Sequence, residues 1–149
     1  MKKWVDLPPV WLLFFLILAW GLARLVPQWN VAFAGQGWLA AGLAAAGVAL
    51  FALAVREMFG ARTTVMPRER PSALVSTGVF RLSRNPIYLA DTLFLLAWVI
   101  WLGNPAGLLL VPLFMRLIAR RFIEGEEAAL RAEFGEEFEA WARRTRRWI

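Results

Sequence analysis

The sequence lacks both cysteine and histidine, and it contains a single tyrosine, Tyr88. The protein therefore has no disulfide, no thiol nucleophile, no imidazole base and no zinc site of the Cys/His type, and we expect no metal centre. Any catalysis must rely on Arg, Glu, Asp, Asn, Tyr or main-chain groups. Reactions that depend on positioning rather than on a strong base remain open.

Charged residues are also scarce. They make up 19% of the 149 residues, whereas 60% of the chain is hydrophobic. An ordinary soluble domain is only about 45–50% apolar, so we do not expect a water-soluble fold. A bundle of four spans, each of about 20 residues, would use most of the chain, so we predict one membrane-embedded domain over residues 1–149.

Four apolar stretches define the predicted spans, at about residues 8–26, 36–59, 86–102 and 105–121. The last two are separated by Gly103-Asn104-Pro105, which predicts a tight helical hairpin. After them, Leu130, Phe134, Phe138 and Trp141 recur at helical spacing and predict an amphipathic helix at about 124–143. The expected fold is an all-α integral membrane protein of about four transmembrane helices, with a hairpin followed by an amphipathic helix.

The charge distribution favours lipid over nucleic acid as the polar partner. The net charge is +6, but the arginines flank apolar runs, so anionic headgroups are the expected counter-charge. The predicted cytoplasmic loop, 60–85, is arginine-rich, while residues 27–35 carry no charge. We therefore expect both termini on the cytoplasmic side of a bacterial inner membrane, and the oligomeric state stays open. The loop arginines are Arg62, Arg68, Arg70, Arg81 and Arg84.

Counting outward from the hairpin turn predicts which polar residues share a depth. Asp91 falls opposite Arg116, Tyr88 near Arg120, and Pro86 near Arg121. Opposite charges at one membrane depth should pair or line a wet cavity. Two interpretations stay open: an ion pair that locks the hairpin, or a substrate site. The candidate substrate-binding residues are Asp91, Arg116 and Arg121.

The most specific pattern begins at Thr77-Gly78-Val79-Phe80-Arg81-Leu82-Ser83-Arg84-Asn85-Pro86-Ile87-Tyr88. After the hairpin come Glu126-Glu127-Ala128-Ala129-Leu130 and Phe134-Gly135-Glu136-Glu137-Phe138. In order and spacing these segments resemble the isoprenylcysteine carboxyl methyltransferase and phospholipid methyltransferase superfamily of integral membrane enzymes. That superfamily carries T-G-x-[YF]-x-x-x-R-H-P-x-Y, a hairpin, and E-E-x-x-L-x-x-x-F-G-x-x-[YF]. The resemblance covers about residues 63–148.

The resemblance implies S-adenosyl-L-methionine as the cofactor and a lipophilic methyl acceptor from the bilayer. The family's histidine is Asn85 here, which cannot titrate, and its substrate-side arginine falls close to Arg120 and Arg121 while Phe122 aligns with it. Tyr88, Arg120 and Arg121 are thus the implied catalytic residues. The implied cofactor contacts are Ser72, Ala73, Leu74, Val75, Phe80, Asn85, Pro86, Ile87, Tyr88 and Glu126.

The acceptor and the activity both have open alternatives. Candidate acceptors are a prenylated carboxylate, a phospholipid amine and an isoprenoid-like lipid. The alternative function is that of a non-catalytic small membrane protein whose basic cytoplasmic face binds anionic lipid or a partner. For Glu126 and its neighbours, a solvated acidic helix face is the corresponding alternative.

Overall fold

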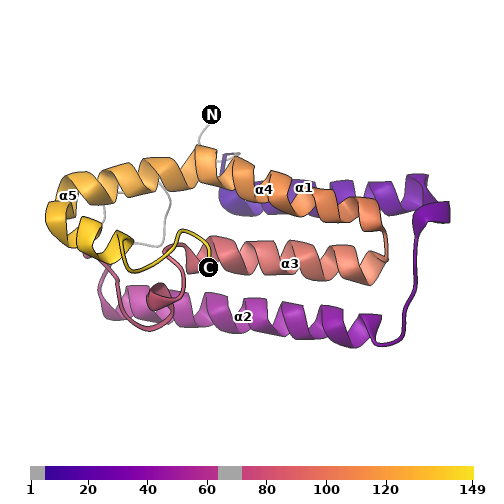
Figure 1. Cartoon of the computed structure of the whole chain (residues 1–149), viewed down its shortest axis with the longest axis horizontal. Helices are drawn as coiled ribbons and strands as arrows, with labels where there is room; N and C mark the ends of the chain where they lie inside the picture. The colour runs from indigo at the N-terminus through magenta and orange to yellow at the C-terminus, as the bar shows by residue number, and fades with distance from the viewer. Residues whose placement is uncertain (1–5, 64–71) are drawn as a thin grey trace. The chain divides into compact units, whose positions relative to one another are not determined.

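The computed structural model describes residues 6–63 and 72–149, which leaves Arg68 and Arg70 of the predicted basic loop outside the described residues. Its elements are helical throughout, with no strand in either described range, and this confirms the predicted all-α class (Figure 1). The long helices are α1 (Pro8–Leu25), α2 (Gln36–Gly60), α3 (Pro86–Leu102), α4 (Leu110–Ile118) and α5 (Glu124–Ala142). Short 3-10 segments are η1 (Pro27–Trp29), η2 (Gly78–Arg81) and η3 (Pro105–Leu109), and η4 (Ala119–Ile123) is a π-helix.

Helices α1 and α2 are long and apolar enough to cross a membrane. Each contains an 18-residue window of high mean hydropathy, and only 22% and 17% of those windows are buried. The core helix of a soluble protein would be mostly buried, whereas these two helices expose large apolar side chains such as Trp20, Trp38 and Phe51. Helix α3 is apolar but shorter, at 17 residues. Of the four predicted spans, two are therefore supported by length and composition.

The described residues pack into two compact units. The first comprises Val48 and the residues before it together with Ala90–Leu117. In it the Phe15 and Phe114 rings meet edge to face with centroids 5.3 Å apart, and both are almost fully buried. The Trp98 indole donates a hydrogen bond to the Leu16 carbonyl at 3.1 Å. Helices α2 and α3 approach closely at Gly47, where a Cβ would lie 2.8 Å from the Phe94 ring.

The predicted hairpin turn is present in this first unit. Gly103 has the left-handed φ of 71°, and the Asn104 side chain accepts a hydrogen bond from the Ala106 N–H at 3.1 Å. The Asn104 amide also donates to Asn30 at 2.8 Å, which ties the turn to the segment after α1. These local contacts explain why Gly-Asn-Pro was a reliable turn signal.

Of the two interpretations of Asp91 and Arg116, the ion pair that locks the hairpin was wrong, and their role in substrate binding stays a prediction. Asp91 is buried, Arg116 is exposed, and no ion pair joins them in the described structure. The count assumed α-helix on both sides of the turn, but the second arm of the helical hairpin begins with 3-10 segment η3. A 3-10 helix rises and rotates more per residue than an α-helix, so both depth and facing direction shift.

The second unit comprises Ala49–Leu89 and Ile118–Ile149. Its hydrophobic core consists of Ala54, Val75, Phe80, Phe138 and Trp141. The Trp141 indole donates to the Phe80 carbonyl at 3.1 Å, which satisfies the polar end of a buried ring.

Helix α5 is not the single continuous helix that the sequence predicted. Gly135 has φ 48° and ψ −117°, a non-helical conformation inside the element. Figure 1 shows that α5 turns back on itself along its length. Glycine adopts this backbone conformation at little cost because it has no Cβ. The break lets Phe138 and Trp141 reach the core of the second unit. The Phe134-Gly135 part of the motif is therefore a turn.

Candidate functional site

The second unit brings together two of the motif segments. Pro86 starts α3, and Tyr88 lies in its first turn with only 7% of its surface exposed. The Tyr88 hydroxyl donates to Glu126 Oε1 at 2.6 Å, and the Tyr88 and Phe122 rings lie 6.3 Å apart, tilted by 36°. A short hydrogen bond from a buried phenol to a carboxylate is strong and orients both groups. Glu126 therefore does not simply lie on a solvated helix face.

The contacts of Tyr88 differ from the hairpin count, which placed it near Arg120. Tyr88 packs on Phe122 and bonds Glu126, four residues further along. Besides η3, which changes the register at the start of the returning segment, η4 at Ala119–Ile123 is a π-helical turn that inserts an extra residue between α4 and α5. Arg120 and Arg121 lie within this turn and are exposed. Turns of this kind are frequent at functional sites.

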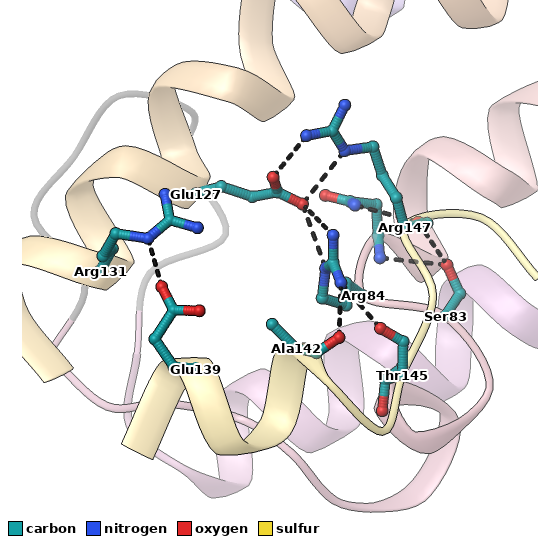
Figure 2. Close-up of polar contacts among 9 residues, drawn as sticks. Ser83, Arg84, Glu127, Arg131, Glu139, Ala142, Thr145 and Arg147 are labelled. Carbon is teal, nitrogen blue, oxygen red and sulfur yellow. Dashed lines mark hydrogen bonds and ion pairs between the residues drawn. The ribbon is translucent and has the colours of Figure 1, made fainter. Parts of the chain in front are cut away.

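Next to Glu126 in the sequence, Glu127 belongs to a network of three charged residues to which the sequence patterns assigned no role. Glu127 lies between Arg84 and Arg147 (Figure 2). Arg84 donates to Glu127 Oε1 at 3.1 and 2.9 Å, and Arg147 donates to both carboxylate oxygens at 3.2 and 2.6 Å. The Glu127 side chain is only 9% exposed. A buried carboxylate with two guanidinium partners is fully compensated.

The same network holds the C-terminal tail. Arg84 donates through its second terminal nitrogen to the carbonyls of Ala142 and Thr145, at 3.0 and 2.8 Å. The Ser83 hydroxyl and the Asn85 amide both donate to the Arg147 carbonyl, at 3.2 and 3.1 Å. The Ser-Arg-Asn part of the motif thus binds main-chain carbonyls of the tail, and Asn85 does so with a donor that needs no titratable proton.

The charges around Glu127 fix the pH range over which it stabilises the fold. Burial alone would raise its pKa, but the hydrogen bonds and positive charges of Arg147 and Arg84 bring the pKa below its usual value near 4.5. Because the folded pKa is depressed, the stabilisation is complete above the unfolded value and is lost as pH falls through the folded one.

We therefore expect the wild-type protein to lose more stability between pH 6 and pH 3 than Glu127→Gln does. The measurement is the midpoint of unfolding in detergent micelles at each pH, for both proteins. Other carboxylates titrate equally in the two proteins, so the difference reports Glu127. If the unfolding midpoints of the two proteins changed equally with pH, the Glu127 carboxylate would not be paired in the folded state.

The other residues implied as cofactor contacts have distinct surroundings. Val75 and Phe80 are in the hydrophobic core, Leu74 and Ile87 pack against it, and Pro86 is fully buried. The Ser72 hydroxyl donates to the Arg62 carbonyl at 2.8 Å, and Ala73 is half-buried. These residues lie in one unit, where Ser72 forms hydrogen bonds and the apolar side chains form packing contacts.

The Thr77-Gly78 dipeptide has a direct structural explanation. The Thr77 hydroxyl donates to Glu57 Oε2 of α2 at 2.8 Å. Gly78 has a left-handed φ of 52°, and a Cβ there would collide with the Glu57 carboxylate. The motif therefore attaches the loop before α3 to α2 within the second unit.

Comparison with known protein families supports the resemblance that the sequence motifs indicated. The model of the phospholipid methyltransferase family matches residues 35–137. The match includes the motif segment before the hairpin, the hairpin, and all but the last residue, Phe138, of the two segments after it. The chain is a helical protein of that methyltransferase class. It belongs to the phospholipid methyltransferase family, part of the isoprenylcysteine and phospholipid methyltransferase superfamily that the motifs resemble.

One relative resembles part of this chain. An uncharacterized protein of Haemophilus influenzae is 40% identical over 63 residues, which are 42% of this chain and all of that protein. No solved structure matches. Membership of the family indicates a methyltransferase acting on a lipid, and together with α1 and α2 it favours a membrane location.

Proposed function

We propose that this protein transfers a methyl group from S-adenosyl-L-methionine to a lipophilic acceptor in the membrane, and that the second unit binds the cofactor. The observation that carries the proposal is the Tyr88–Glu126 hydrogen bond of 2.6 Å, because it joins the N-P-x-Y and E-E parts of the family motif across 38 residues. We also propose that α3 and the helical run from η3 through η4 are the third and fourth spans, with both termini cytoplasmic.

The residues around this pair fit the chemistry of the cofactor. The Glu126 carboxylate can accept hydrogen bonds from the methionyl ammonium, which adds a charged interaction in a partly buried position. The Tyr88 ring is held next to Glu126 by its hydroxyl, and the face of an aromatic ring attracts a cation such as a sulfonium. When bound, the cofactor supplies a methyl group on a positively charged sulfur.

The residues of this chain then have to position the acceptor and exclude water. Charge disperses during methyl transfer from a sulfonium, so an apolar, well-ordered site accelerates it without a strong base. Arg120 and Arg121, exposed on the π-helical turn, are suited to bind an acidic group of the acceptor. Among the candidate acceptors, a phospholipid amine agrees best with the description of the matching family.

The test combines binding and turnover. The purified protein in detergent should bind S-adenosylhomocysteine in calorimetry. Incubation of its membranes with methyl-labelled S-adenosylmethionine should label one lipid class, identified by mass spectrometry. Binding without any labelled lipid would contradict the lipid acceptor, and absence of both would favour the non-catalytic alternative.

A further inference from the structure

The first unit contains two neighbouring cavities that the methyl-transfer residues do not use. One, of about 600 Å³, is lined by apolar side chains of α1, α2 and α3, among them Leu13, Ala44 and Phe94. The other, of about 590 Å³, contains Arg24 in its lining. Both cavities are lined in part by the same three residues, Trp20, Trp98 and Trp101. An apolar cavity and a charged one therefore adjoin along a shared aromatic wall.

The charged cavity has the composition of a membrane interface. Arg24 is in the last turn of α1, and its guanidinium carbon lies 5.5 Å from the centroid of the Trp20 ring. Trp20 and Trp101 are 47% and 60% exposed. Exposed tryptophans at a helix end are typical of the level of lipid headgroups. Arg24 contributes the sole charge among the described residues that line either cavity.

The walls of both cavities are held by specific hydrogen bonds. The Trp98 indole is fixed to the Leu16 carbonyl, and the Gln36 amide donates to the carbonyls of Ile100 and Trp101 at 2.7 and 3.0 Å. The Asn30 amide donates to the Ala23 carbonyl at 3.1 Å. A largely preformed apolar cavity with a few fixed polar groups is the usual form of a small-molecule site, and about 300–1,000 Å³ is its usual size.

We propose that these cavities bind one anionic phospholipid, with an acyl chain in the apolar cavity and the phosphate on Arg24. The apolar cavity favours a hydrocarbon occupant, and the Arg24 guanidinium in the adjoining cavity favours an anionic group attached to it. One molecule that meets both requirements is a phospholipid with a net negative headgroup. The site depends on the membrane placement of α1 to α3 and does not require the proposed methyl transfer.

The test is native mass spectrometry of the protein released from micelles that contain phosphatidylglycerol or phosphatidylcholine with the same acyl chains. The wild-type protein should retain one phosphatidylglycerol in preference to phosphatidylcholine. Arg24→Gln should lower phosphatidylglycerol occupancy about fivefold, since one charged contact at an exposed site contributes up to about 1 kcal/mol and about 1.4 kcal/mol is tenfold in affinity. The matched control Arg56→Gln, which changes an exposed arginine of α2 in the second unit, should not change it.

A second pair of variants tests the apolar cavity. Ala44→Phe should fill it and reduce retention of both lipids, and Ala41→Leu, on the same wall, should act in the same direction. Helicity by circular dichroism checks that each variant is folded. Inorganic phosphate should not displace the bound phosphatidylglycerol, because burial of the acyl chain contributes much of the affinity. Equal retention of the two lipids by the wild type, or equal losses in Arg24→Gln and Arg56→Gln, would overturn the proposal.

Discussion

Replacing Glu127 with leucine should destabilise the second unit by about 3 kcal/mol. The change leaves Arg84 and Arg147 close together without the carboxylate that both of them bind, and uncompensated charges are costly where they are partly buried. We expect the lower end of the range for a broken buried pair, because the Arg147 side chain is 35% exposed and water can reach it. Chemical unfolding in micelles, followed by circular dichroism, measures the loss.

The chain offers a matched control on the same helix. Glu139 pairs with Arg131, but these side chains are 42% and 54% exposed (Figure 2). Exposed pairs contribute about 0.2–1 kcal/mol, so Glu139→Leu should cost little. If the two substitutions cost the same, Glu127 would be an ordinary surface carboxylate and the network would not hold the fold.

The loss of stability in Glu127→Leu should be concentrated at the C-terminal tail. The Arg84 N–H donates to the Arg146 carbonyl at 2.9 Å, and the Arg84 side chain binds two further tail carbonyls. In Glu127→Leu the amides of Arg84 and of residues 143–145 should exchange hydrogen faster than in the wild type, whereas the amides of α1 should not change. Uniform acceleration along the chain would indicate global unfolding instead of release of the tail.

Local signals predicted the helices and the hairpin turn well. The apolar runs gave α1, α2 and α3 to within a residue at each end, and Gly103-Asn104 identified the turn, because helix ends and turns depend on neighbouring residues. The break at Gly135 was missed, since a glycine inside a helical pattern costs only about 1 kcal/mol and usually does not end the helix.

The site was only partly predictable, for a physical reason. The motif identified Tyr88 and Glu126, which do meet. The register between α3 and the returning helical segment depends on η3 and η4. Neither a 3-10 start nor a π-helical turn can be recognised from hydrophobic periodicity. The network of Arg84, Glu127 and Arg147 joins residues 20 and 43 positions apart, and such long-range contacts have no periodic signal.

The Tyr88–Glu126 pair gives the most direct test of the cofactor site. If Glu126 binds the methionyl ammonium, Glu126→Gln removes a charged hydrogen bond of about 1.5–3 kcal/mol, so affinity for S-adenosylhomocysteine should fall about 10- to 150-fold. Tyr88→Phe removes only a group that orients Glu126, and a loss of about 0.5–1.5 kcal/mol should weaken binding between about twofold and tenfold.

The double variant shows whether the two residues act together. Because the Tyr88 hydroxyl works through the Glu126 carboxylate, Tyr88→Phe with Glu126→Gln should bind nearly as well as Glu126→Gln alone. Glu133→Gln, at an exposed glutamate of α5, is the matched control and should retain wild-type affinity. Calorimetry on the four variants and the wild type, each checked for an unchanged unfolding midpoint, makes the comparison. Wild-type affinity in Glu126→Gln would remove the carboxylate from the cofactor site, and fully additive losses would mean that Tyr88 contacts the cofactor independently.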